Sequence, residues 1–275
     1  MNTQYYRLGL IGHNIGHSLS PEIFRLFFEQ SGLQGEMVIY DFPPNELPDR
    51  IAELRDLAGF SITIPYKNKI IDYLDDLDNK ANLIKAVNCI QIFQSRMVGY
   101  NTDINGFAST MTDWPEKVST ILILGHGGAA RAVITAIVAQ YPKVRLIICG
   151  RDRKRIELFC GAMRGAFKGL DISGMTCQTL PLGLSADVII NTTPLGDINH
   201  IDKMLLPSRF GFDKRPFCYD LVYRPSKTLF LKNAAAQGCR YKNGLGMLAA
   251  QAAESFLLWT GKTVGPEKTL KLLPE

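Results

Sequence analysis

One segment constrains the fold of this 275-residue chain more than any other. Residues 120–124 (TILIL) are almost wholly apolar and rich in β-branched side chains, which is typical of a strand buried inside a parallel sheet. The glycine-rich stretch Gly125-His-Gly-Gly128 follows at once, and residues 129–140 show a helical pattern. A buried strand, a tight turn and a helix in this order begin a βαβ unit, so the segment predicts a parallel sheet covered by helices.

The glycines of this turn suit the binding of a pyrophosphate. Gly125 permits a tight turn, and Gly127 and Gly128 let a phosphate approach the backbone closely. The helix that begins near Ala129 directs free N–H groups and its positive dipole end at the same place. Ala130 replaces the third glycine of the G-x-G-x-x-G pattern, which the pattern tolerates. Structural turns also use glycine, but the position between a strand and a helix favours dinucleotide binding.

A basic cluster follows the next predicted strand, residues 144–148. It reads Arg151-Asp-Arg-Lys-Arg155, and guanidinium groups bind phosphates well. Arg151 and Arg155 therefore favour NADP, which carries a 2′-phosphate, over NAD. A solvated basic helix start is the alternative. Asp152 leaves the choice open, because it suits either a helix N-cap or the carboxylate that binds the ribose of NAD.

Strands and helices alternate along the rest of the chain as well. The expected strands are residues 8–11, 38–40, 59–64, 186–190 and 217–222, with a hairpin of residues 87–93 and 97–100. The expected helices are one capped by Ser20 and opened by Pro21, and those at residues 46–57, 69–77, 152–160, 228–237 and 246–259. This alternation predicts an α/β fold.

Composition excludes several classes of protein. Hydrophobic residues make up 46% and charged residues 21%, which is enough for a sizeable core and excludes a wholly disordered chain. No stretch reaches the roughly 18 continuous apolar residues of a membrane span, and the N-terminal residues lack a signal-peptide pattern. The net charge of +5 is dispersed, so it indicates no nucleic acid and is compatible with an anionic small ligand. We therefore expect a cytoplasmic protein with no membrane or nucleic-acid partner.

The cysteines and histidines give no sign of a disulfide or a metal site. The six cysteines contain no Cys-x-x-Cys pair and several lie in apolar runs, which predicts buried free thiols in a reducing compartment. His13 and His17 have the spacing of a metal pair on a helix, but Gly12, Gly16 and Pro21 oppose a regular helix there. No metal is expected.

Hydroxyl, amide and charged residues gather at the predicted strand ends of the first half. Residues 18–20 (SLS) stand at a helix start, and Thr63 and Lys67 follow the third strand, where open α/β sheets bind their ligands. Asn88 begins a strand, and residues 101–103 (NTD) follow the end of one. Each of these residues alone has an ordinary explanation as a cap, a turn or a surface lysine.

Taken together, the segments resemble the shikimate dehydrogenase family nearly end to end, from Gly12 through Trp259. The matching segments, in the family's order, are SLSP at 18–21, TIPYK at 63–67, AVN at 86–88, NTD at 101–103 with Gly106, GHGGAAR at 125–131, NTTPLG at 191–196, YDLVYRP at 219–225 and NGLGMLAAQ at 243–251. So many segments in one order make the resemblance far more specific than the glycine turn alone.

The resemblance implies a two-domain α/β oxidoreductase. Residues 1–103 and 245–275 would form a substrate-binding catalytic domain, to which the last long helix returns, and residues 104–244 a Rossmann-type NADP-binding domain. The implied reaction is the reversible NADPH-dependent reduction of 3-dehydroshikimate to shikimate, a step of chorismate and aromatic amino-acid biosynthesis. The active site would be a cleft between the domains, in a monomer or a homodimer.

The resemblance also assigns roles to individual residues. Lys67 and Asp103 would be the catalytic pair. The substrate would be bound by Ser18, Ser20, Thr63, Asn88, Tyr223 and Gln251. The cofactor would be bound by Gly125, Gly127, Gly128, Ala129, Arg151, Arg155, Thr192, Gly244 and Met247, although core packing is an equal explanation for Met247.

The chemistry of an alcohol–ketone interconversion agrees with these assignments. The reaction couples a hydride transfer, which the nicotinamide carries, to a proton transfer at the oxygen. A positioned lysine can pass that proton, and a neighbouring carboxylate can orient the lysine. Ser, Thr, Asn and Gln side chains supply the paired donors and acceptors that a polyhydroxylated ring needs, since each missing partner costs about 1–3 kcal/mol.

Some positions depart from the family's usual residues. Ser61 and Gly150 stand in place of Asn, Phe24-Arg25 in place of His-Asn, Cys89 in place of Thr, and Asp197 in place of Met. Gly150 and Asp152 would touch the cofactor, so NAD remains possible. The alternatives are an NAD-linked quinate/shikimate dehydrogenase and a catalytically silent NADP- or shikimate-binding regulator, against which the presence of Lys67 and Asp103 argues.

Overall fold

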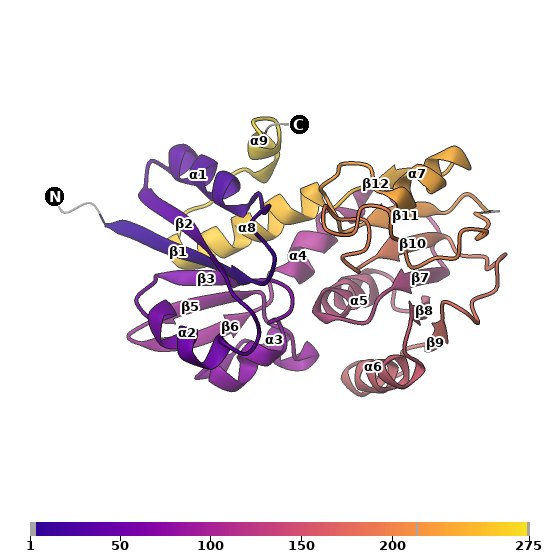
Figure 1. Cartoon of the computed structure of the whole chain (residues 1–275), viewed down its shortest axis with the longest axis horizontal. Helices are drawn as coiled ribbons and strands as arrows, with labels where there is room; N and C mark the ends of the chain where they lie inside the picture. The colour runs from indigo at the N-terminus through magenta and orange to yellow at the C-terminus, as the bar shows by residue number, and fades with distance from the viewer. Residues whose placement is uncertain (1–3, 213, 274–275) are drawn as a thin grey trace. The chain divides into compact units, whose positions relative to one another are not determined.

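The computed structural model describes residues 4–212 and 214–273, which form two compact units. The first unit contains the described residues up to Ser109 and those from Gly246 onward, and the second runs from Thr110 to Leu245. Each unit is built around one six-stranded sheet with helices packed against it (Figure 1). The predicted α/β fold with a Rossmann-type unit is confirmed.

The sheet of the first unit is mixed, with the strand order β2-β1-β3-β5-β6-β4. Its strands are β1 (Tyr5–Gly12), β2 (Gln34–Asp41), β3 (Gly59–Ile62), β4 (Asp76–Leu77), β5 (Cys89–Phe93) and β6 (Arg96–Tyr100). β1 is parallel to β2 and β3, whereas β5 is antiparallel to β3 and β6. Gln94 and Ser95 both have positive φ at the tip of the predicted hairpin, the backbone that a two-residue hairpin turn requires.

Helices cover both faces of this sheet. They are α1 (Ser20–Ser31), α2 (Leu47–Leu54), α3 (Asn79–Ile84), α4 (Asp103–Ala108), α8 (Leu245–Thr260) and α9 (Pro266–Leu270). α1 and α8 pack on one face through Phe24, Phe27 and Phe256, and α2 and α3 pack on the other through Leu54 and Ala81 (Figure 1). The apolar spacing of α1 produces this arrangement, because its buried residues lie on one side of the helix.

Two sequence predictions for this unit were wrong. Ser20 does not cap α1: Leu19 holds the N-cap position, Ser20 is the first helical residue, and Ser20 instead takes part in a hydrogen bond with Ser18. The helix expected at residues 69–77 is only a 3₁₀ turn, Lys69–Tyr73, followed by β4. Asp76 and Leu77 extend because they pair with Val98 and Gly99 of β6, a contact that local sequence does not encode.

The helix α8 is fixed to the first sheet at its far end by Trp259. The Trp259 indole N–H donates to the Ile90 carbonyl at 2.8 Å. A Cβ on Gly59 would lie 2.2 Å from that indole nitrogen, so only glycine lets the ring reach the strand. The α4 helix also belongs to this unit, since a Cβ on Gly106 would lie 2.7 Å from Gln251 Cβ. The boundary of the units therefore falls after Ser109, six residues beyond the position expected from sequence.

The sheet of the second unit is entirely parallel and has the order β12-β11-β10-β7-β8-β9. Its strands are β7 (Thr120–Leu124), β8 (Arg145–Gly150), β9 (Ile172–Thr176), β10 (Val188–Asn191), β11 (Phe217–Asp220) and β12 (Tyr241–Lys242). Its helices are α5 (Gly128–Gln140), α6 (Arg153–Ala166) and α7 (Leu229–Ala236), with a 3₁₀ turn at Met111–Asp113. This is the strand order of the doubly wound dinucleotide-binding fold, which reverses direction between β7 and β10.

The helices of the described residues include no candidate for a membrane span. None of them combines the length and the apolar character that a membrane crossing requires. The longest, α8, has 16 residues, and its buried side chains pack within the protein.

Candidate active site

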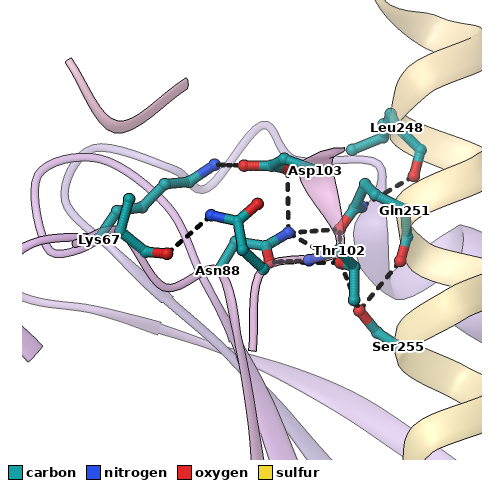
Figure 2. A network of polar contacts seen from close by, with 9 residues as sticks. Lys67, Asn88, Thr102, Asp103, Leu248, Gln251 and Ser255 are labelled. Carbon is teal, nitrogen blue, oxygen red and sulfur yellow. Dashed lines mark hydrogen bonds and ion pairs between the residues drawn. The ribbon is translucent and has the colours of Figure 1, made fainter. Parts of the chain in front are cut away.

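A lysine and an aspartate from distant parts of the first unit form an ion pair (Figure 2). Lys67 lies in the turn that follows β3, and Asp103 is the first residue of α4, three positions after the end of β6. Lys67 Nζ donates a hydrogen bond to Asp103 Oδ2, and the two side chains are 15% and 6% exposed. The contact that the sequence interpretation required is therefore present, in a largely desolvated setting where charge interactions are strong.

Asn88 fixes the other oxygen of the aspartate. Its Nδ2 lies 2.9 Å from Asp103 Oδ1, 2.9 Å from Thr102 Oγ1 and 3.2 Å from Gln251 Oε1, and its Oδ1 accepts from the Thr102 backbone N–H at 2.7 Å (Figure 2). The backbone of Asn88 is itself held between strands, because its carbonyl accepts from Ile62 of β3. Asn88 thus joins β3, α4 and α8 at one point, and its two amide hydrogens serve three acceptors.

The helix α8 brings two polar residues to this network. Gln251 donates from Nε2 to the Leu248 carbonyl at 2.8 Å, which leaves its Oε1 beside Asn88. Ser255 donates to the Gln251 carbonyl and lies 3.1 Å from Thr102 Oγ1. Sequence reasoning gave Thr102 no role, although it lies in the NTD segment, and missed Ser255. The signal for Ser255 was available, since it lies four positions after Gln251 and therefore on the same face of α8.

A pair of serines lies at the start of α1. Ser18 Oγ lies 3.2 Å from Ser20 Oγ and accepts from the Ser20 backbone N–H at the same distance. Thr63 stands beside the preceding loop, since a Cβ on Gly12 would lie 2.7 Å from Thr63 Cγ2, and the neighbouring His13 N–H donates to the Ile64 carbonyl. The start of the loop that leads from β1 to Ser18 and Ser20 therefore contacts the segment after β3, on which Thr63 lies. Three of the hydroxyls expected at the site thus lie on adjoining segments.

The glycine-rich turn of the second unit has the geometry that the sequence predicts. Gly125 has φ +107°, and a Cβ there would lie 2.6 Å from Thr192 Oγ1, at the carboxyl ends of β7 and β10. Gly127 is the N-cap of α5, no side chain of the described residues caps that helix, and a Cβ on Gly127 would meet open space. The first N–H groups of α5 are therefore available to an anion at the point where the strand order reverses.

The basic cluster lies at the start of α6. Asp152 is the N-cap of this helix, since its Oδ1 accepts from the Arg155 backbone N–H at 3.1 Å, and its Oδ2 lies 3.6 Å from Arg155 Nε. The sequence left two roles open for Asp152, a helix N-cap and a ribose-binding carboxylate. The structure shows Asp152 as the N-cap. Arg151 and Arg155 are exposed, and Arg155 lines an open pocket. Two guanidinium groups beside a capped helix start form a favourable environment for a phosphate.

Comparison with known proteins identifies the family. A family model described as the shikimate dehydrogenase substrate binding domain matches residues 10–90, and one described as the shikimate 5′-dehydrogenase C-terminal domain matches residues 244–273. A shikimate dehydrogenase (NADP(+)) of Bacillus subtilis (strain 168) is 36% identical, with 94% of this chain and 93% of the relative covered. The chain belongs to the shikimate dehydrogenase family.

Solved structures of the family agree over the whole chain. A crystal structure of shikimate dehydrogenase in complex with NADP+ has a TM-score of 0.87 at 32% identity and covers 100% of this chain and 98% of its own. The enzyme from Thermus thermophilus, in complex with NADP(H) and shikimate, has a TM-score of 0.81 at 33% identity and 97% coverage of each chain.

The structure explains two departures from the usual shikimate dehydrogenase pattern. Phe24 is fully buried and packs its ring against Phe256 and Trp259, with centroids 6.2 and 5.5 Å apart, so an aromatic residue suits this position in the core. Asp197 orders its own turn, since its Oδ1 accepts from the Asn199 N–H at 3.0 Å and lies 2.8 Å from His200 Nδ1. Nothing in the structure explains the pairing of Ser61 with Cys89 across β3 and β5.

The structure shows the surroundings of three further residues to which the family resemblance assigns a role. Gly244 is needed for the backbone itself, because a Cβ there would lie 2.0 Å from the Leu221 carbonyl oxygen. Met247 is buried in the first turn of α8, where its side chain is also a packing residue. Tyr223 belongs to the second unit and is half-buried, three residues after β11. The close contact with Leu221 is thus a structural reason for Gly244 that the sequence did not reveal.

A buried aspartate at the end of β11 was also missed from sequence. Burial raises the pKa of Asp220 to about 7, although three donors face the carboxylate. These donors are Thr228 Oγ1 at 2.6 Å, Asn191 Nδ2 at 2.9 Å and the Val222 N–H at 3.0 Å. They tie β10, β11 and the start of α7 together near the glycine turn.

We expect the charge of Asp220 to make the stability of the folded chain depend on pH. Its pKa is higher in the folded state than its ordinary value of 3.8, so the folded state binds the proton more tightly than the unfolded state. The free energy of unfolding should therefore fall as pH rises from about 4 to about 7, by a few kcal/mol, and Asp220→Asn should remove that part of the slope. Urea unfolding of both proteins across this range measures the difference, and parallel pH profiles would contradict the expectation.

Proposed function

We propose that this member of the shikimate dehydrogenase family interconverts shikimate and 3-dehydroshikimate with NADP(H), and that Lys67 and Asp103 are its catalytic pair. The balanced reaction is shikimate + NADP+ ⇌ 3-dehydroshikimate + NADPH + H+. The observation that carries the proposal is the desolvated Lys67–Asp103 ion pair, which stands beside the Asn88 amide. An ammonium held in this way is a proton donor with a fixed direction.

Each member of the pair has a distinct task. In the reducing direction the ketone oxygen becomes a hydroxyl, and Lys67 Nζ supplies the proton. In the oxidising direction the same nitrogen accepts the hydroxyl proton. Asp103 Oδ2 holds Nζ in place, while Asn88 holds Asp103 Oδ1 at 2.9 Å, so the carboxylate cannot turn away from the lysine. NADP+, when bound, supplies the hydride acceptor.

The polar side chains of the first unit fit a ring that carries several hydroxyls and a carboxylate. Ser18, Ser20 and Thr63 offer hydroxyls on adjoining segments, and Asn88 and Gln251 offer amides in direct contact with each other. We assign these residues and Tyr223 to substrate binding. A substrate that lacks one hydroxyl would leave a polar group unpaired, at a cost of about 1–3 kcal/mol.

The second unit has the features needed to bind a dinucleotide that carries a 2′-phosphate. Open space above Gly127, uncapped N–H groups at the start of α5 and the guanidinium groups of Arg151 and Arg155 are the features that such a cofactor requires. We propose that residues 127–129 and Thr192 bind the pyrophosphate of the cofactor. Arg151 and Arg155 would bind the 2′-phosphate on its adenosine ribose. Gly244 and Met247 remain proposed neighbours of the nicotinamide.

An assay matrix of shikimate and quinate against NADP+ and NAD+ tests the function. Absorbance of the reduced nicotinamide should rise fastest with shikimate and NADP+. Equal or faster turnover with NAD+ and quinate would instead support an NAD-linked quinate/shikimate dehydrogenase. No absorbance change at high enzyme concentration, together with retained NADPH binding, would support a silent regulator and overturn the proposal.

The cofactor preference predicts the effect of one arginine. Arg151→Ala should raise the KM for NADP+ about tenfold, because a charge-assisted hydrogen bond to the 2′-phosphate is lost, and should leave the KM for NAD+ nearly unchanged. Steady-state kinetics with both cofactors measures this difference. Arg153→Ala is the matched control, since Arg153 is also exposed and pairs with Glu157 at 2.9 Å. Equal losses for both cofactors would contradict the assignment of Arg151.

We further propose that the enzyme acts in the cytoplasm. The six cysteines are all free, and five of them are buried. Burial raises the pKa of the Cys89 and Cys149 thiols to about 12, so these groups stay protonated and unreactive. Thiols in this state are typical of proteins from a reducing compartment.

A further inference from the structure

The histidine inside the glycine turn has no role in the function described so far. His126 stands between Gly125 and Gly127, and its ring packs edge-on against Phe159 of α6, with centroids 6.3 Å apart and planes at 71°. It lines an open pocket of about 450 Å³ in the second unit. The pocket is lined by His126, Gly127, Arg131, Arg155, Leu158 and Phe159.

The ring of His126 occupies the space that a side chain at position 150 would need. A Cβ on Gly150 would lie 2.9 Å from His126 Nδ1 and 3.0 Å from Ile156 Cγ1. The asparagine common at this position in the family and a histidine at position 126 therefore cannot both fit without displacement. The absence of a side chain at position 150 thus leaves room for the His126 ring. The contact lies at the carboxyl end of β8, where the ribose of a dinucleotide is expected.

The two ring nitrogens of His126 have different surroundings. Nδ1 is buried and has no hydrogen-bond partner among the described residues, so a proton on this nitrogen would lack an acceptor. Burial, together with the nearby Arg155 and Arg151, lowers the pKa of His126. This arrangement favours the neutral ring with its proton on Nε2, which is not among the buried nitrogens without a partner and is the nitrogen available to a ligand.

We propose that His126 is a cofactor-specificity residue that donates from Nε2 to the 2′-phosphate of NADP(H), and that Gly150 exists to make room for its ring. This inference rests on the proposed NADP-dependent function. Arg155 shares the pocket wall, so the phosphate there would receive a neutral donor and a cation together. The unphosphorylated ribose of NAD(H) would gain far less from either group.

Binding of the reduced cofactors tests the proposal without turnover. His126→Ala should weaken NADPH binding about tenfold and NADH binding no more than about twofold, as measured by nicotinamide fluorescence. His200→Ala is the matched control, because His200 is a half-buried histidine of the same unit that pairs with Asp197. Equal weakening for the two nucleotides, or none, would overturn the proposal. Wild-type activity with shikimate and NADP+ tests the underlying function separately.

A double-mutant cycle tests the coupling of positions 126 and 150. Gly150→Asn alone should lower the melting temperature and weaken NADPH binding, because the new side chain meets the His126 ring. His126→Ala combined with Gly150→Asn should recover much of the melting temperature. Strictly additive effects would overturn the steric coupling.

Histidine NMR signals give an independent readout. The chain has only four histidines, so their ring signals can be assigned by single substitutions. NADP+ should shift the His126 signal much more than NAD+ does, whereas an equal shift for the two would overturn the 2′-phosphate contact.

Discussion

Lys67→Ala is expected to lower kcat by about 10²–10⁴-fold while the KM for shikimate changes little. Nζ is the group placed to exchange a proton with the reacting oxygen, and without it only solvent can do so. Steady-state kinetics at saturating NADP+ measures both constants.

The design of this experiment separates proton transfer from a general loss of charge. Lys69→Ala is the matched control, since Lys69 is an exposed lysine two residues after Lys67, at the start of the 3₁₀ turn Lys69–Tyr73. It should retain wild-type kcat. Asp103→Asn keeps the shape of the side chain and removes its charge. It should therefore lower kcat, while the free energy of unfolding changes less than it would if the whole side chain were removed. A Lys67→Ala enzyme with near-wild-type kcat would refute the proton-transfer role.

Asn88→Ala is expected to lower both stability and activity. The Asn88 amide is almost fully buried and holds Asp103, Thr102 and Gln251 together. Its removal leaves buried partners unsatisfied, which should reduce the free energy of unfolding by about 2–4 kcal/mol and lower kcat at least about tenfold. Chemical denaturation and steady-state kinetics on the same preparation measure the two effects.

A neighbouring asparagine provides the control for this prediction. Asn101 is also buried, and its amide donates to the Ala86 carbonyl at 2.8 Å instead of to the catalytic pair. Asn101→Ala should destabilise the fold to a similar degree but reduce kcat much less. If the two variants lose kcat in the same proportion to their loss of stability, Asn88 has only a structural role.

Segments with a strong local pattern could be predicted from the sequence. The strand β7 has the predicted bounds, because five apolar residues followed by a glycine turn leave little choice. Helices α5 and α8 were placed to within a residue or two. By contrast, β9 (ISGMT) was missed, since its glycine and serine give no strand pattern and it forms by pairing with β8.

The candidate site also contains residues that could be predicted from the sequence and residues that could not. Lys67, Asp103 and Asn88 were given roles from their motifs. Thr102 and Asp220 lie in motifs that were named but were given no role, and Ser255 was not named. Thr102 and Ser255 meet across 153 positions of the chain. The spacing of Ser255 from Gln251 places both residues on one face of α8, but no local pattern indicates that this face meets Thr102. Family resemblance supplied the roles of the named residues, and geometry alone added the others.

By itself, the sequence determined the alternation of strands and helices, the glycine turn and the chemical types present at the strand ends. These features depend on neighbours within a few residues, where spacing and backbone preference act. Only the tertiary structure decided that Lys67 meets Asp103 across 36 positions, that Asn88 meets Gln251 across 163, and that Gly150 makes room for His126. The burial of two sheet faces fixes strand register and helix position together, and such contacts arise from the packing of the whole unit.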